Sequence, residues 1–204
     1  MFKDLGIKDW KYTYTLMKNF VQKKRFQNEI WFTEHLPVFI LGKKNNNKKI
    51  YYITQKINIY NSNRGGGITY HGPGQQLVYF LIYLKKIKKM FYLIKLIKRS
   101  VISTLNYFNI TSYYIPHRPG IYVNKKKICS IGLCFKNGYS MHGLSLNVDM
   151  DLFPFNLIVP CENYGVKMTN IKLFNKFILI EDVKKILKKK INFFYNKFFI
   201  NNNS

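Results

Sequence analysis

An Asn-Gly dipeptide between two apolar runs constrains the fold of this chain more than any other feature. Asn137-Gly138 separates Lys127–Phe135 from Tyr139–Asn147. Both central positions of a two-residue hairpin turn need a positive φ, which Asn and Gly adopt at little cost, so the pattern predicts an antiparallel β-hairpin. Residues whose numbers sum to 275 then face each other across the hairpin, which places His142 opposite Leu133.

The rest of the chain mixes helical and extended patterns. Apolar residues at helical spacing follow Asp9, a typical N-cap residue, and recur in Lys88–Tyr107 and near the C-terminus. Short apolar runs at Ile30–Phe32, Val38–Leu41 and Leu77–Leu84 indicate strands. The last run lacks polar alternation, so both of its faces are expected to be buried. The apolar positions of the two terminal helices are Trp10, Tyr14, Met17, Phe20 and Val21, and Val183, Ile186, Leu187, Ile191 and Phe194.

These elements do not follow the strand–helix–strand rhythm of a parallel sheet. Their order predicts an α+β fold with a mixed, largely antiparallel β-sheet flanked by helices. With 204 residues, 47% hydrophobic and 21% charged, the chain suits one globular domain over residues 1–204. The tail 201–204 is expected to fray, and Lys43–Lys49 is expected to form a solvated loop.

The net charge of +25 favours acidic partners, which include nucleic acids, anionic membranes and acidic proteins. Only four of the 34 basic residues are arginines, and alanine is absent, as is typical of a protein from an AT-rich genome. Codon bias therefore accounts for most of the charge. A basic nucleic-acid-binding protein is an alternative, and it predicts binding that weakens steeply with salt. We expect no nucleic-acid partner, because no nucleic-acid-binding module is recognisable.

The sequence contains no candidate membrane span. Its longest strongly apolar run, Leu77–Leu84, is far shorter than the roughly 20 residues that cross a bilayer as a helix. The N-terminal stretch Met1–Asp9 has no apolar signal core, and no transit peptide rich in Arg and Ser precedes the domain. We therefore expect a cytoplasmic protein, in a bacterium rather than a plastid.

The three cysteines differ in their surroundings. They form no CxxC pair and no Cys/His ligand pattern, so no metal site is expected, and their odd number indicates reduced thiols. Cys129 and Cys134 lie in an apolar strand, where cysteine behaves as a small core residue. Cys161 instead follows Pro160 within Ile158–Gly165, which reads as a loop. A loop thiol next to a positive group becomes reactive, so Cys161 is a candidate nucleophile.

Five glycines crowd into the segment Arg64–Gln75 together with Arg64 and His71. Glycine lets the backbone approach a ligand closely, and consecutive N–H groups can form a pocket for an anion or oxyanion. Arg64 would add a fixed positive charge. No Gly-Lys-Ser/Thr follows, so this is not a phosphate-binding loop of the GxxxxGK[ST] type. A tight surface turn, with a structural role for His71, is the alternative.

Lys127 begins the first strand of the predicted hairpin. If it lies at a buried sheet edge, desolvation would lower its pKa and allow it to act as a base. Lys125 and Lys126 are expected to be solvated. His142 falls on the same sheet face as Lys127 by the period of two, but about 20 Å away along the strand. His142 is therefore the weaker catalytic candidate, unless a bulge intervenes.

Several motifs occur together in the order and spacing of one known family. They are RGGGITYHGPGQQ, KKICSIGL, HGLSLNVDMDLFPF and IVPC, with WFTEHLPVF upstream. Over about Glu29–Ile171 the chain thus resembles the octanoyl-(acyl carrier protein):protein octanoyltransferase family. The resemblance implies the fold of the biotin and lipoate protein ligases. It also implies transfer of an octanoyl group from acyl carrier protein to a lysine of a lipoyl domain, without a cofactor.

The resemblance further assigns roles to residues. The family's nucleophile, which is acylated as a thioester, corresponds to Cys161, and the lysine that lowers the pKa of that thiol corresponds to Lys127. The implied acceptors are the lipoyl domains of 2-oxoacid dehydrogenase complexes and the glycine cleavage H protein. The implied substrate pocket consists of Arg64, Gly65, Gly66, Gly67, Ile68, Thr69, Tyr70 and His71, of Ser130, Ile131 and Gly132, and of Gly143, Leu144 and Ser145.

The chain departs from the family pattern beside the nucleophile, where Glu162 replaces the usual glycine, and in the unusual segment His117–Gly120. A carboxylate aimed at the thiol would oppose its ionisation, so Glu162 is expected to face solvent. The nearest alternative is an ATP-dependent lipoate or biotin protein ligase of the same fold, which needs no nucleophilic cysteine. An inactive remnant of the family is a further alternative, which the presence of both Cys161 and Lys127 opposes.

Overall fold

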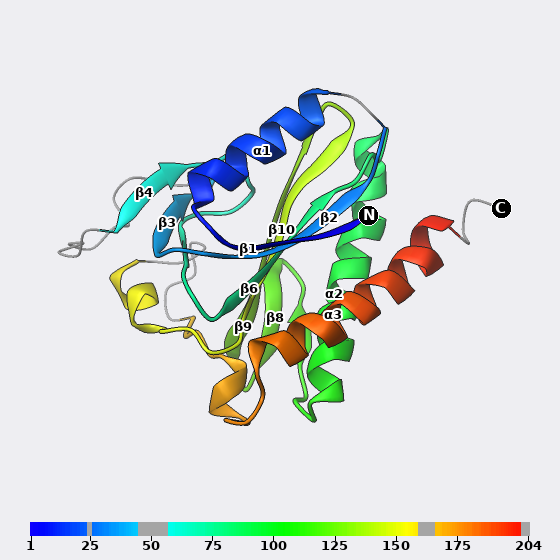
Figure 1. Ribbon diagram of the computed structural model, residues 1–204. Coiled ribbons are helices and arrows are strands. Elements are labelled where there is room, and N and C mark those ends of the chain that lie inside the picture. The colour runs from blue at the N-terminus through cyan, green and yellow to red at the C-terminus, as the bar shows by residue number, and fades with distance from the viewer. Residues whose placement is uncertain (24–25, 45–56, 159–165, 201–204) are drawn as a thin grey trace.

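The computed structural model describes residues 1–23, 26–44, 57–158 and 166–200. Two sheets form its framework (Figure 1). From edge to edge, the large sheet contains β1 (Phe2–Lys8), β2 (Glu29–His35), β6 (Gln75–Leu81), β10 (Tyr139–Asn147), β9 (Lys126–Lys136), β8 (Arg118–Val123) and β7 (Tyr113–Ile115). The small sheet contains β4 (Asn58–Asn61), β3 (Val38–Leu41) and β5 (Thr69–His71).

Helices cover both faces of the large sheet. Figure 1 shows α1 (Trp10–Gln22) on one side and α2 (Met90–Tyr107) with α3 (Ile180–Tyr195) on the other. Apolar side chains of α2 and α3 pack against β6 and β10 in the largest core cluster, whereas Met17 and Val21 of α1 pack on the opposite face. Short helical turns occupy Ile87–Lys89, Phe153–Leu157, Ile171–Leu173 and Asn196–Ile200. Within the described residues, no helix is long and apolar enough to cross a bilayer.

The predicted α+β architecture is confirmed, with every pairing in the large sheet antiparallel except that of β1 with β2. The hairpin is also confirmed, because Tyr139 faces Lys136 and His142 faces Leu133. All residues of β6 are buried, as its unbroken apolar run predicts. Each predicted helix is present, although the second α-helix begins two residues later than expected, after a short 3₁₀ turn.

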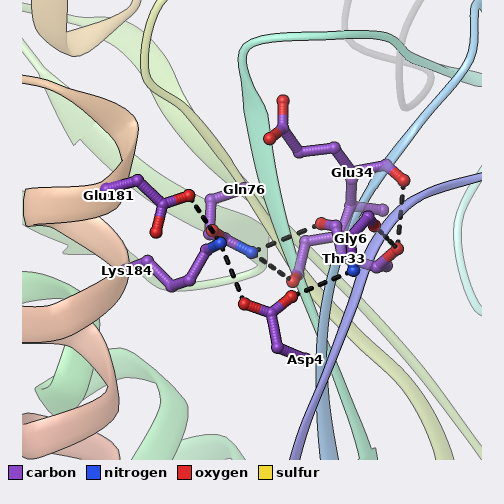
Figure 2. A network of polar contacts seen from close by, with 8 residues as sticks. Asp4, Gly6, Thr33, Glu34, Gln76, Glu181 and Lys184 are labelled. Carbon is purple, nitrogen blue, oxygen red and sulfur yellow. Dashed lines mark hydrogen bonds and ion pairs between the residues drawn. The ribbon is translucent and has the colours of Figure 1, made fainter.

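The N-terminal strand β1 was not predicted, because its sequence FKDLGIK shows no regular apolar alternation. It pairs parallel to β2 at the edge of the large sheet. Figure 2 shows how side chains connect this edge to α3: the Lys184 ammonium bonds Asp4 of β1 at 3.0 Å and Glu181 at 2.7 Å. The Thr33 hydroxyl also donates to the Gly6 carbonyl at 2.7 Å. Contacts with distant parts of the chain therefore determine where this strand forms.

A bulge in β9 breaks the alternation expected for the hairpin. Ile121 of β8 faces Cys129 while the next residue, Tyr122, faces Lys127, so Ile128 is the extra residue. Ile128 and Cys129 consequently both enter the core beneath α2 and α3. Lys127 turns to the other face with Tyr122, and its Nζ lies 5.5 Å from the centre of that ring.

A second irregularity affects His142, which has a φ of +63°. Its partner Leu133 packs against the cluster beneath α2 and α3, but the His142 ring stacks on Tyr14 of α1 with centroids 5.6 Å apart. Lys127 and His142 therefore do share the face away from α2 and α3. The unbroken alternation from which this was predicted is wrong, since one strand bulges and the other has a residue in the left-handed region.

Candidate active site

The glycine-rich segment bridges the two sheets. The N–H of Gly42, just after β3, donates to the Gly67 carbonyl at 3.1 Å, and the Lys43 N–H donates to the Arg64 carbonyl at 3.0 Å. On the other side, the Gly65 N–H donates to the Leu133 carbonyl of β9 at 3.0 Å. A Cβ atom at Gly42 would collide with the Gly66 carbonyl oxygen, so only glycine permits this approach.

Arg64 holds the segment together rather than pointing an unused charge outward. Its side chain is 8% exposed, and its terminal nitrogens donate to the carbonyls of Ile40, Gly65 and Gly67 at 2.8, 3.0 and 2.6 Å. The Gly65 N–H is likewise engaged with Leu133. An oxyanion pocket in this segment therefore has to use other N–H groups than that of Gly65.

The end of the segment forms β5, in which Thr69 and Tyr70 pair with Ile40 and Phe39 of β3. Ile68 and Tyr70 are buried in a separate apolar cluster beside the large sheet. This cluster also includes Phe39, Leu41, Met150, Phe155 and Ile158, with Met168 packed against it. Ile158 directly precedes residues 159–165 and Met168 follows them, so the chain on both sides of that segment packs in the cluster that contains Ile68 and Tyr70.

Lys127 is buried, with only 2% of its surface exposed, at the start of an inner strand rather than at a sheet edge. Its backbone N–H donates to the Lys167 carbonyl at 2.9 Å, and its carbonyl accepts from the Thr169 N–H at 2.9 Å. These two bonds fasten the chain that follows residue 165 to Lys127. Gly120, with a φ of +143°, leaves room for the lysine side chain, because a Cβ there would lie 3.0 Å from Lys127 Cε.

The two remaining groups of predicted pocket residues lie opposite each other in the hairpin. Ser130 faces Ser145, Ile131 faces Leu144, and Gly132 faces Gly143. A Cβ at Gly132 would lie 3.4 Å from the Arg64 side chain, so the glycine-rich segment passes directly over this part of β9. The structure thus brings Arg64–His71 and Ser130–Gly132 together, with Gly143–Ser145 on the adjacent strand.

The described cysteines are poor nucleophiles. Cys129 is fully buried, and burial raises the pKa of its thiol to about 12 even though the Lys127 charge opposes the rise. Burial also raises the pKa of Cys134. Both behave as the core residues that the strand pattern predicts. Cys161 and Glu162 lie outside the described residues, as do the tail 201–204 and most of the predicted loop Lys43–Lys49.

Three buried histidines, His35, His71 and His142, lie near one another in the candidate site. Burial lowers the pKa of His71 and of His142 to about 3, and that of His35 to about 4. All three are therefore neutral at physiological pH. His35 binds the Tyr79 hydroxyl at 2.8 Å, and His142 binds the Asn63 side chain at 2.6 Å. Among the described residues, no three His, Cys, Asp or Glu side chains are grouped so that they could hold a metal ion.

The sequence reasoning missed four residues of the site. Gln75, Asn147 and Thr169 connect His71 to the backbone of Lys127 through buried hydrogen bonds, and Tyr122 packs against the lysine. One signal was present, because Gln75 and Asn147 are polar residues at the ends of otherwise apolar runs. A polar side chain in such a position is informative, since it is rarely buried without a partner.

Comparisons with known proteins agree with the motifs. The lipoyl protein ligase A/B catalytic domain family matches residues 7–192. An octanoyltransferase of Buchnera aphidicola from Acyrthosiphon pisum is 46% identical over 98% of this chain and 96% of its own length. The octanoyltransferase of Wigglesworthia glossinidia brevipalpis is 48% identical over 84% and 80%, and one of Yersinia pseudotuberculosis 37% over 93% and 82%.

Solved structures show the same fold. A crystal structure of lipoate-protein ligase A bound with ATP superposes with a TM-score of 0.78, at 13% identity, over 97% of this chain and 84% of the other. The biotin protein ligase of Aquifex aeolicus gives a TM-score of 0.56, at 12% identity, over 97% and 69%. At these identities the likeness establishes the fold alone, and it confirms the predicted ligase-like architecture.

Proposed function

This chain belongs to the lipoyl protein ligase A/B catalytic domain family and, within it, to the octanoyltransferases, and we propose that it carries the octanoyl group as a thioester on Cys161. The enzyme is an acyltransferase of protein lipoylation. Beyond this family assignment, we also propose the acyl donor and the role of Lys127. The donor is octanoyl-acyl carrier protein, and the acceptor is a lysine of a lipoyl domain.

The placement of Lys127 is the observation that carries the proposal. Its side chain is buried, and its backbone bonds Lys167 and Thr169, which follow residues 159–165 in the chain. Burying an ammonium is costly unless an anionic partner lies near it, and a nearby ammonium favours a thiolate over a thiol. Elimination points to the same nucleophile, because the thiols of Cys129 and Cys134 are held protonated by burial.

The first chemical step transfers the acyl group to the enzyme. The Cys161 thiolate attacks the carbonyl carbon of the octanoyl thioester, and backbone N–H groups of the Gly66–His71 stretch stabilise the oxyanion. The bond to the pantetheine sulfur breaks, and this leaving thiolate takes a proton from the Lys127 ammonium. One thioester replaces another, so the step is close to energetic balance.

The second step transfers the acyl group to the partner. The ε-amine of the lipoyl-domain lysine attacks the acyl-enzyme, the Cys161 thiolate leaves, and the Lys127 amine accepts the proton released by the attacking nitrogen. This restores the starting charges on both residues. Conversion of a thioester to an amide is downhill, so neither step requires ATP.

The lipoyl-domain acceptors that we propose are those of the 2-oxoacid dehydrogenase complexes and of the glycine cleavage H protein, and the site of action is the bacterial cytoplasm. The charge of the chain supports partners of this type, because a net charge of +25 attracts acidic carrier and acceptor domains and speeds their encounter. The same attraction predicts slower transfer at high ionic strength.

A transfer assay tests the role of Lys127. The purified enzyme is mixed with octanoyl-acyl carrier protein and an unmodified lipoyl domain without ATP, and the mass of the lipoyl domain is followed. We expect octanoylation by the wild type and a loss of at least about 100-fold in Lys127→Met. Lys126→Met, the neighbouring exposed lysine, should retain activity. A requirement for ATP and free octanoate would instead indicate a ligase.

A further inference from the structure

A continuous run of buried hydrogen bonds joins the glycine-rich segment to the backbone of Lys127. His71 Nδ1 lies 2.6 Å from Gln75 Oε1, and Gln75 Nε2 lies 2.8 Å from Asn147 Oδ1. Asn147 Nδ2 donates to the Thr169 carbonyl at 2.9 Å, and the Thr169 N–H donates to the Lys127 carbonyl at 2.9 Å. Gln75, Asn147 and Thr169 are each at most 1% exposed, so water does not compete for these bonds.

The direction of this run is fixed at its far end. The Thr169 oxygen is a backbone carbonyl, which can only accept, so Asn147 must present its NH₂ group to it. The Asn147 oxygen therefore faces Gln75, which must present its own NH₂ group. The Gln75 oxygen is left to face His71, so the proton of the neutral imidazole resides on Nδ1.

The charge state of His71 completes the argument. Burial, followed by the nearby His35, lowers the pKa of His71 to about 3, so the ring carries no charge at physiological pH. With the proton on Nδ1, Nε2 carries a lone pair. His142 has the opposite tautomer, with its proton on Nε2, because Nε2 faces the Asn63 oxygen.

We propose that Gln75 and Asn147 are positioning residues that lock His71 in the Nδ1–H tautomer and tie the glycine-rich segment to Lys127. His71 Nε2 is then a permanent hydrogen-bond acceptor for an N–H or O–H donor of the substrate. The proposal rests on the proposed function only in treating Arg64–His71 as part of the substrate site. A protonated or inverted imidazole would present a donor there instead and would repel the same substrate group.

Long-range ¹H–¹⁵N NMR of the histidine-labelled enzyme tests the tautomer without any activity measurement. The His71 signals are identified by their loss in His71→Gln. We expect a protonated Nδ1 and an unprotonated Nε2 for His71, with no titration from pH 8 down to about pH 5, and the opposite tautomer for His142. A protonated Nε2 on His71, or a midpoint near its ordinary pKa, would overturn the proposal.

Gln75→Leu removes the acceptor, and Gln76→Leu is the matched control. Gln76 is the adjacent residue of β6 and is equally buried, but its amide donates to the Thr33 and Leu77 carbonyls. Gln75→Leu should release the fixed His71 tautomer and lower kcat by about tenfold, whereas Gln76→Leu should alter neither. An unchanged tautomer in Gln75→Leu contradicts the proposal.

The wild-type spectrum decides the tautomer even if Gln75→Leu does not fold. The octanoyl-transfer function and the His71 tautomer can also be refuted independently of each other. A locked His71 in a protein that does not transfer octanoyl groups would refute the function but not the tautomer. Transfer by a protein whose His71 is protonated on Nε2 would refute the lock but not the function.

Discussion

Lys127 owes its position to neighbours that leave room for a long side chain inside the protein. Gly120 has no side chain where Lys127 Cδ and Cε pass, and the Tyr122 ring offers its face to the ammonium. The bulge at Ile128 then turns the lysine away from the core beneath α2 and α3. The residue type could be read from the sequence, but its surroundings depend on pairing between β8 and β9.

Gly120→Ala should displace Lys127. The new Cβ would lie 2.6 Å from the Cys129 carbonyl oxygen and 3.0 Å from Lys127 Cε, and φ at this position is +143°. We expect kcat/KM for octanoyl transfer to fall by at least about tenfold and stability by roughly 1–3 kcal/mol. Gly6→Ala is the control, because Gly6 has a φ of +63° but open space around its Cβ position. Normal transfer kinetics in Gly120→Ala would refute this account of the lysine.

The roles that the family motifs imply for the site residues remain a prediction. The structure places Arg64 against Gly132 of β9, whereas Lys127 is joined to His71 through a run of hydrogen bonds. Arg64 binds backbone carbonyls, however, and the link through Gln75 and Asn147 was missed. The bond between Gln75 and Asn147 joins residues 72 positions apart, and local patterns carry no information on which distant polar groups meet.

Among the elements, α1 has an N-cap that the sequence predicts, and it packs against a buried histidine of the candidate site. Asp9 Oδ1 accepts from the Tyr12 N–H at 2.8 Å and so caps the helix. The helix then packs Met17 and Val21 on the sheet and stacks Tyr14 on His142. A frayed N-terminus would loosen both contacts.

Asp9→Ala should lower the free energy of unfolding by about 1 kcal/mol, because the Tyr12 N–H loses its partner. Asp9→Asn keeps a capping oxygen and should differ from the wild type by only a few tenths of a kcal/mol. Urea titration followed by circular dichroism measures both. Equal stability of Asp9→Ala and Asp9→Asn would show that the side-chain cap contributes nothing.

The elements that were predicted well are those whose signals are local. The Asn137-Gly138 turn specifies the register of β9 with β10, and the N-cap and apolar spacing specify α1. The strand β1 and the bulge at Ile128 escaped prediction because distant partners create them. Lys184 of α3 holds Asp4, and the β8 strand determines where β9 bulges.

At the scale of the whole molecule, three buried neutral histidines make stability depend on pH. Their folded-state pKa values of about 3, 3 and 4 lie below the unfolded value of 6.5. Between these limits the unfolded chain binds more protons, so acidification favours unfolding. The stability is fully present above the unfolded pKa and is lost as pH falls towards the folded values.

We expect each of these histidines to cost about 1.4 kcal/mol of stability at pH 5.5 relative to neutral pH, or about 4 kcal/mol together. Denaturant titrations at pH 7.5 and pH 5.5 measure the difference. His142→Asn is a suitable comparison, because Asn tolerates the positive φ of this position and should remove about a third of the loss. Stability that does not change between the two pH values would contradict the neutral assignment.

We propose that the sulfur of Cys161 carries the octanoyl group between the donor and acceptor proteins. Intact-mass spectrometry of the enzyme after mixing with octanoyl-acyl carrier protein, with no acceptor present, tests it most directly. The wild type and Cys134→Ser should each gain the mass of one octanoyl group, and Cys161→Ser should gain none. An octanoyl group retained in full by Cys161→Ser would contradict the account.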